Sequence, residues 1–183
     1  MLKRGVIVKK KAALIFSLAM ILLIIFSLSA CGKAVEKIAE KAIENNLGEN
    51  SDVKVDDTGV VISNEQGEVQ SGGSATIPEG WPSEAPAYPD IKVTYSAKTK
   101  DENKNDSFAI FAEVTKGTVK EVYEWHKSKM TGWEVKSDNF YTTNGNDSFS
   151  LQWKNDKYEV LLMVGLDGNV TSYTMTIVQT VSE

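Results

Sequence analysis

Few residue types in this sequence could carry out catalysis or bind a metal. The chain of 183 residues contains one cysteine, Cys31, and one histidine, His126. One cysteine cannot form an intramolecular disulfide, and these two side chains are too few ligands for a zinc or iron site. His126 lies at helical spacing from apolar residues, which favours a buried structural role over that of a catalytic base. No Gly-x-Ser-x-Gly pattern is present to position a nucleophilic serine.

Carboxylates are the remaining reactive groups, since the chain has 25 Asp and Glu against 20 Lys and Arg. Two of them could act together as in glycoside hydrolases, so a carboxylate-based hydrolase is the alternative function. Residues Asp101 to Asp106 are similar to the start of a calcium loop, but the sixth is not Gly and the twelfth, Ala112, cannot supply a carboxylate. A solvated hairpin loop is favoured, and weak calcium binding stays open. The sequence therefore predicts no enzymatic activity, no cofactor and no metal site.

The four tryptophans could form a platform on which a sugar stacks, so small-ligand or glycan binding is a further alternative. Strand alternation places Trp133 and Trp153 on the inner side of their strands, which favours a role in the core. Trp125 lies within the expected helix. Only Trp81, beside several prolines, is expected to be exposed.

The reactive cysteine follows a segment typical of a secreted precursor. Five basic residues and no acidic ones lie within residues 1–11, and residues 12–28 are uncharged and rich in Leu, Ile and Phe. These are the charged and apolar regions of a signal peptide. Leu28-Ser29-Ala30-Cys31 then resembles the lipobox of bacterial lipoprotein precursors. That resemblance implies that the Cys31 thiol receives a diacylglyceryl group, that the preceding peptide bond is cut, and that Cys31 becomes the first residue.

Lipidation would place the protein on the extracytoplasmic face of the cell membrane. Each buried methylene contributes about 0.8 kcal/mol, so two or three acyl chains hold a soluble domain on the bilayer. An uncleaved helical anchor and a plain secretory signal remain as alternatives. Cleavage removes five basic residues, leaving 15 against 25 acidic ones and a net charge of −10. Such a charge makes nucleic acid an improbable partner.

The rest of the chain divides by composition into residues 31–77 and 78–183, after the signal peptide at residues 1–30. Residues 32–80 contain no aromatic residue, and all four prolines lie at the border, within residues 78–89. Because proline fixes the backbone and removes a donor, this segment should run extended. Only the part that follows has the aromatic residues for a large core.

The first part begins with an expected amphipathic helix at residues 33–47, ended by Gly48. Three interpretations of this helix stay open: it packs on the globular domain, it forms a stalk near the membrane, or it binds a partner. Short β-hairpin strands are expected around Val53, Val60 and Val69. A flexible Gly and Ser joint follows them. The apolar positions of the expected helix are Val35, Ile38, Ala39, Ala42, Ile43 and Leu47.

The second part shows alternating apolar residues in six segments and a capping box at Thr118 to Glu121. The expected order is ββαββββ, an α+β fold in which one long helix packs on one face of a mostly antiparallel sheet. Ile91, Val93 and Tyr95 are expected to share the buried face of the first strand. Hairpin turns are expected at Asn144-Gly145, Asn155-Asp156 and Asp167-Gly168.

One helix is too narrow to cover such a sheet. Six strands at about 4.8 Å spacing are about 24 Å wide, whereas a helix is about 10 to 12 Å across. The segment 33–47 is the simplest additional cover, and a partner or ligand is the other. Leu161 and Met163, which lie out of phase with the buried series of their strand, predict a central strand partly buried on both faces.

The overall layout resembles small bacterial cell-surface lipoproteins of unknown function. The sequence thus predicts a lipid-anchored, extracytoplasmic binding module whose lipid attachment site is Cys31. Its expected partners are the lipid bilayer and either an envelope protein or a small ligand.

Overall fold

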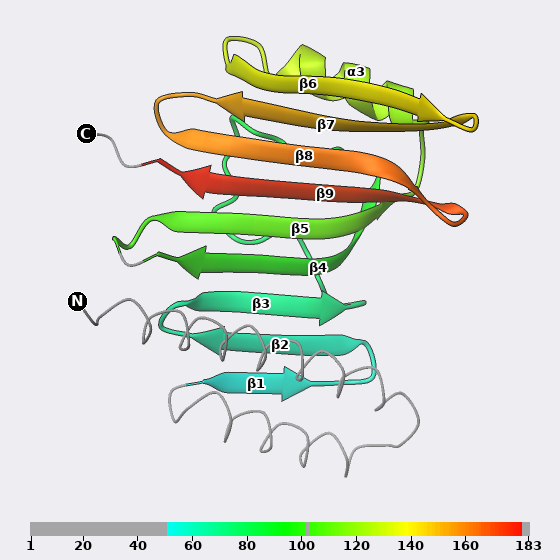
Figure 1. Cartoon of the computed structure of the whole chain (residues 1–183). Coiled ribbons are helices and arrows are strands. Elements are labelled where there is room, and N and C mark those ends of the chain that lie inside the picture. Colours follow the sequence, from blue (N-terminus) through cyan, green and yellow to red (C-terminus); the bar gives the residue numbers. More distant parts are fainter. Residues whose placement is uncertain (1–50, 102, 181–183) are drawn as a thin grey trace, which may run out of the picture.

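A computed structural model describes residues 51–101 and 103–180, which form a single antiparallel β-sheet with one helix (Figure 1). The nine strands lie in the spatial order β1-β2-β3-β4-β5-β9-β8-β7-β6. Every pairing between neighbours is antiparallel. The elements are β1 Asp52–Val55, β2 Gly59–Asn64, β3 Gly67–Gly72, β4 Ile91–Lys100, β5 Asp106–Val114, α3 Val119–Lys129, β6 Glu134–Thr143, β7 Asn146–Lys154, β8 Tyr158–Asp167 and β9 Val170–Gln179.

The order ββαββββ, predicted for the second part of the chain, is confirmed by β4 to β9 and α3. Two details of the expected fold are wrong. The helix is short, with 11 residues, because the chain leaves it at Met130 and turns at Gly132, whose φ of +84° favours glycine. The sheet has nine strands, because β3 pairs with β4 and joins the N-terminal hairpins to the main sheet. The expected helix at 33–47 lies outside the described residues.

One face of the sheet, here called the covered face, carries the hydrophobic core. Alternate residues of strands β5, β9, β8 and β7 point to this face and are buried. Val119 and Val122 of α3 pack onto the same core. The buried strand residues are Phe108, Ile110, Ala112, Tyr173, Met175, Ile177, Val160, Leu162, Val164, Phe149, Leu151 and Trp153.

The proline-containing segment provides the second cover of this face. It lies on the same side of the sheet as α3, behind the strands in Figure 1. Ala85 is fully buried, Tyr88 is 8% exposed, and the Tyr88 amide donates to the Tyr173 hydroxyl at 3.4 Å. The expectation that this segment runs extended is only partly right, because two turns interrupt it, closed by hydrogen bonds from the Trp81 amide to the Pro78 carbonyl and from the Ala85 amide to the Pro82 carbonyl. The segment still covers sheet that the short helix does not reach.

The face opposite the core, here called the open face, faces the viewer in Figure 1. Strand β8 lies inside the sheet, between β9 and β7, but Leu161 and Met163 are 37% and 45% exposed on this face. The prediction that this strand is partly buried on both faces is therefore wrong. Tyr95 also lies on the open face, opposite Phe111, because a bulge between Val93 and Tyr95 shifts the alternation of β4.

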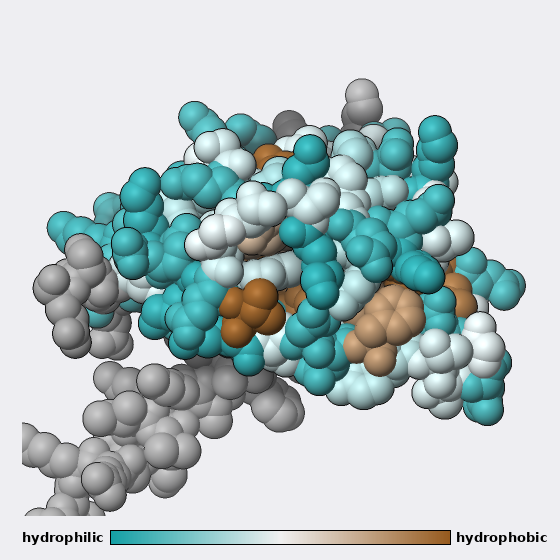
Figure 2. Space-filling view, turned by 90° about the horizontal axis from the view of Figure 1, so that it is seen from above, coloured by the Kyte–Doolittle hydropathy of each residue, from teal (hydrophilic) through white to brown (hydrophobic). Residues whose placement is uncertain are grey.

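Strands β1 and β6 form the two edges of the sheet. Strand β6 is almost entirely exposed and carries Glu134, Lys136 and Asp138. Viewed onto this edge, hydrophobic areas are small and separated within a mostly hydrophilic surface (Figure 2). Charged side chains on an edge strand oppose pairing with a strand of another molecule.

Candidate functional site

Cys31, the expected lipid attachment residue, and the apolar segment before it lie outside the described residues. Across residues 51–101 and 103–180, no helix is long and apolar enough to span a bilayer.

His126 is fully buried between α3 and the sheet. Its Nε2 lies 3.1 Å from the hydroxyl of Tyr173, and the rings of Trp125 and Trp153 pack beside it. Burial lowers the pKa of His126 from 6.5 to about 3, so the imidazole is neutral near pH 7. A neutral ring enclosed by aromatic side chains matches the structural role that the sequence favours.

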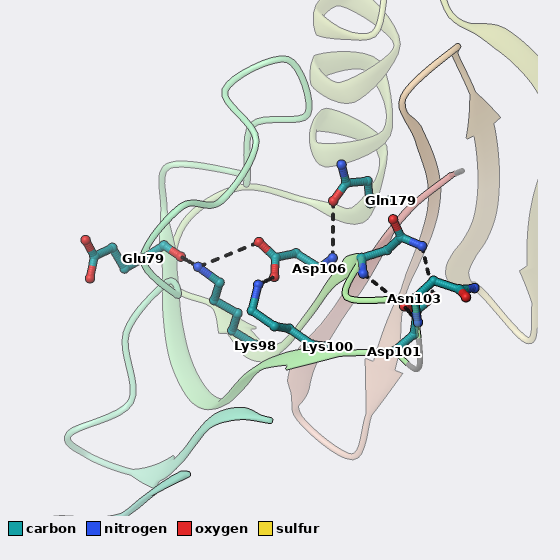
Figure 3. Close-up of polar contacts among 8 residues, drawn as sticks. Glu79, Lys98, Lys100, Asp101, Asn103, Asp106 and Gln179 are labelled. Atoms are coloured by element: carbon teal, nitrogen blue, oxygen red, sulfur yellow. Dashed lines mark hydrogen bonds and ion pairs between the residues drawn. The ribbon is translucent and has the colours of Figure 1, made fainter. Parts of the chain in front are cut away.

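The loop that is similar to a calcium site directs its carboxylates in two directions (Figure 3). Asp101 accepts hydrogen bonds from the backbone amides of Asn103 and Asn105 at 2.8 and 2.9 Å. Asp106 pairs instead with Lys100 at 2.6 Å. Asp101 therefore stabilises the turn of its own hairpin. Within the described part of the chain, no group of three or more His, Cys, Asp and Glu could hold a metal ion.

Lys98 joins the proline-containing segment to the sheet at the same end of β4. Its Nζ donates to the carbonyl of Glu79 at 3.1 Å and lies 5.6 Å from the centre of the Phe108 ring. Asp106 lies 3.9 Å from the same nitrogen. These contacts are only partly shielded from solvent, so they contribute modestly to stability. The cluster links two segments of the fold and shows no arrangement typical of catalysis.

Among residues 51–101 and 103–180, the carboxylates whose pKa clearly departs from the ordinary value all have a lowered pKa, because they accept hydrogen bonds. A general acid of a hydrolase needs the opposite, a raised pKa. The hydrolase alternative therefore gains no support from these groups. The main donors are the Thr58 hydroxyl to Asp56, the Asn105 amide to Asp101, the Thr118 amide to Glu121, and Lys127 to Asp138.

The four tryptophans all belong to the core or its border. Trp153 is 2% exposed, as its alternation predicts. Trp133 is partly buried against the core, but it precedes β6, and Val135 of the same expected series is exposed, so strand alternation does not explain its burial. The expectation that Trp81 is exposed is wrong, because its ring packs edge-on against Phe108 and its indole nitrogen donates to the Ala85 carbonyl at 2.8 Å. Trp125 packs against Tyr88. The tryptophans therefore form no common platform for a sugar.

The open face carries a continuous uncharged surface, which we call the uncharged stripe. It consists of two adjacent rows of paired residues, each with one residue from every strand. The first row is Val55, Val60, Ser71, Tyr95, Phe111, Thr174, Met163, Ser150 and Asn139, and the second is Val53, Ile62, Val69, Ala97, Ala109, Thr176, Leu161, Gln152 and Ser137.

Charged residues flank the stripe on both sides but do not enter it. The cross-strand pair of Lys92 and Glu113 lies on one side, and the ion pair of Lys154 and Glu159, at 2.9 Å, lies on the other. With nine strands about 4.8 Å apart, the stripe is about 38 Å long. Two uncharged rows of that length are unexpected in a chain in which 25% of the residues are charged.

The centre of the stripe is apolar and exposed. Phe111, Leu161 and Met163 are 47%, 37% and 45% exposed, and the Tyr95 ring packs edge-on against Phe111 at 5.3 Å. Exposed apolar residues that gather on one surface are typical of an interaction site. Sequence reasoning missed this site. Its signal was the apolar residues that lie out of phase with the buried series of β5 and β8.

No protein-family model matches this sequence, and a comparison with curated proteins finds no match.

Proposed function

We propose that this protein is a lipid-anchored binding module on the extracytoplasmic face of the cell membrane, and that it binds an envelope protein through the centre of the uncharged stripe. The observation that carries the proposed binding function is the exposure of Phe111, Leu161 and Met163 within a surface that has no charged residue. The anchor rests on the signal peptide and lipobox pattern that ends at Cys31.

The chemistry of the stripe favours a protein partner over other ligands. Apolar side chains alternate across the strands with the hydroxyls of Thr174 and Thr176. Such a surface can bury apolar area and form peripheral hydrogen bonds, as the core and rim of protein interfaces do. It offers no cationic group for a phosphate or carboxylate ligand. The expected partner surface is therefore apolar at its centre and uncharged.

The anchor is tested by feeding cells an alkyne-bearing fatty acid and measuring its incorporation into the full chain. We expect labelling of the unaltered protein in the membrane fraction. The Cys31→Ser variant should lose the label and leave that fraction, because the thiol is the site of acylation. Equal labelling or equal membrane retention of the variant would contradict the lipid anchor.

The partner is tested by photo-crosslinking of the full chain in native cells, with the photoreactive residue at position 163 in the stripe or at position 124 on the exposed side of α3. We expect a discrete adduct only from position 163. Leu161→Glu should remove that adduct, because a charge placed next to Met163 must be desolvated on binding. Ser83→Glu, which adds the same charge on an exposed position away from the stripe, should leave it unchanged.

Two results would contradict the proposed binding surface. The first is an adduct at position 163 that persists in the Leu161→Glu variant. The second is equal adduct formation from positions 163 and 124, because this would indicate random collision and not a defined interface.

A further inference from the structure

The centre and the β1–β2 end of the uncharged stripe differ in exposure although they lie on the same face of one sheet. At the centre, Phe111 and Met163 are 47% and 45% exposed. At the β1–β2 end, Val53 and Val60 are only 4% and 5% exposed. Together with Val55 and Ile62 these valines form a cluster separate from the main core, here called the hairpin cluster.

The sheet by itself does not explain this burial. The hairpin cluster lies opposite the covered face, because Val60 pairs with Ser71, and Ser71 pairs with Tyr95 of the open face. Among residues 51–101 and 103–180, the cluster draws its members from β1 and β2 alone. From β3 to β6, by contrast, every residue of the stripe is half-buried or exposed, and none is buried. The hairpin cluster therefore requires a cover from outside the described residues.

We propose that the segment 33–47 of this chain docks as an amphipathic helix on the hairpin cluster. Its apolar positions, Val35 to Leu47, span about 18 Å at 1.5 Å per residue. A strand of four to six residues, such as β1 or β2, spans about 14 to 20 Å. The apolar side of the segment is therefore about as long as the strands that carry the hairpin cluster.

Chain length restricts the C-terminal end of the segment to this end of the sheet. Only Gly48, Glu49, Asn50 and Ser51 separate Leu47 from the first residue of β1. Fully extended, this connection reaches about 17 Å. Strand β8, with Leu161 and Met163, lies six strand positions away, about 29 Å from β1. The C-terminal end of the segment thus reaches the hairpin cluster but not β8.

Charge is compatible with this arrangement. The polar side of the segment carries Lys33, Glu36, Lys37, Glu40, Lys41 and Glu44, three of each sign. Because its apolar side meets only valines and an isoleucine, no charged group is buried on docking.

Docking also determines where the domain stands relative to the membrane, and this consequence rests on the proposed lipid anchor. Cys31 lies two residues before Lys33, so no long tether separates the acyl chains from the docked segment. A helix of 15 residues is about 22 Å long. The β1 edge of the sheet would then be held within about that distance of the leaflet, which excludes the alternative of an extended stalk.

The test measures labelling of introduced cysteines by a water-soluble maleimide in the full chain in membrane fractions. The introduced residues are Val60→Cys in the hairpin cluster, Met163→Cys at the centre of the stripe and Ala112→Cys on the covered face. Labelling of the chain without an introduced cysteine is subtracted. We expect position 60 to react roughly tenfold or more slowly than position 163, because a buried thiol reacts only when its cover opens.

Removing the apolar side of the segment should expose position 60. We expect Ile38→Glu with Ile43→Glu to raise labelling there to near that of position 163, since each buried isoleucine favours docking by roughly tenfold or more. The control, Lys37→Gln with Lys41→Gln, changes only the polar side and should leave position 60 protected. Position 112 should stay protected in both, which shows that the sheet remains folded.

The proposal is overturned if position 60 reacts as fast as position 163 in the unaltered chain, or if it stays protected in the Ile38→Glu and Ile43→Glu variant while the chain remains folded. If that variant exposes position 112, Ile38→Ala with Ile43→Ala is used instead. It should give intermediate labelling at position 60, and unchanged labelling would overturn the proposal equally. The Cys31→Ser variant, labelled in whichever cell fraction contains it, should show the same protection at position 60, so failure of the lipid anchor and failure of docking are distinguishable.

Discussion

The single histidine should make the stability of this fold depend on pH between about 5 and 7. In the folded protein, burial lowers the pKa of His126 from 6.5 to about 3. In the unfolded chain the imidazole is exposed and has its ordinary pKa near 6.5. Because the folded pKa is the lower one, the unfolded state binds a proton that the folded state does not. Stability is therefore full above about pH 6.5 and is lost as the pH falls toward 3.

The expected size of the effect follows from these two values. One proton bound only by the unfolded state reduces the free energy of unfolding by about 1.4 kcal/mol at pH 5.5 and about 2 kcal/mol at pH 5. For a domain of this size, 1.4 kcal/mol is roughly a 5 °C decrease in Tm. Carboxylates such as Asp138 have unfolded pKa values near 4, so their effect on stability begins below this range.

The assay is urea unfolding of residues 32–183 at pH values between 7.5 and 5, compared with a His126→Gln variant. Glutamine is neutral at every pH and can still bond the Tyr173 hydroxyl. Whatever its stability at pH 7.5, the variant should lose the pH dependence above pH 5. An equal loss of stability in both proteins would refute the assignment to His126. So would an imidazole NMR signal that titrates near pH 6.5 in the folded state.

Three further predictions test the packing. Leu162→Ala, on the covered face, should cost about 2 to 5 kcal/mol in urea unfolding, whereas Leu161→Ala, on the open face, should cost less than about 1 kcal/mol; similar costs would contradict the assignment of the two faces. Thr118→Ala should cost about 1 kcal/mol, because the hydroxyl that accepts from the Glu121 amide at 3.2 Å is lost, and Thr118→Ser should restore most of it. Gly145→Ala should cost about 1 kcal/mol, since its φ of +80° is unfavourable for a residue with a Cβ; an unchanged midpoint in urea would argue against this turn conformation.

Much of the local structure follows from the sequence by short-range physics. The capping box at Thr118 was readable because the hydroxyl and carboxylate that satisfy the first amides of the helix lie three residues apart. The turn at Asn144-Gly145 was readable because both residues tolerate positive φ, and the structure has φ of 53° and 80° there. Strand alternation likewise predicts which side of β9 faces the core. These features need only neighbours along the chain.

Tertiary pairing decided the rest of the fold. The bulge in β4, which moves Tyr95 to the open face beside Phe111, depends on how β4 aligns with β5. The union of β3 with β4 makes one nine-stranded sheet out of segments that differ in composition. The proline-containing segment covers the core, and no local pattern specifies which surface an extended chain will meet.

The two candidate sites differ in the same way, because one is a local sequence motif and the other depends on the tertiary structure. Leu28-Ser29-Ala30-Cys31, which resembles a lipobox, is a local motif that can be read from four contiguous residues, and lipidation at Cys31 stays a prediction from the sequence. The uncharged stripe exists only in the folded sheet, because its residues come from nine strands and are brought together by their register. Register depends on contacts between residues distant in sequence, so only the tertiary structure could show that Tyr95, Phe111, Leu161 and Met163 share the open face of the sheet.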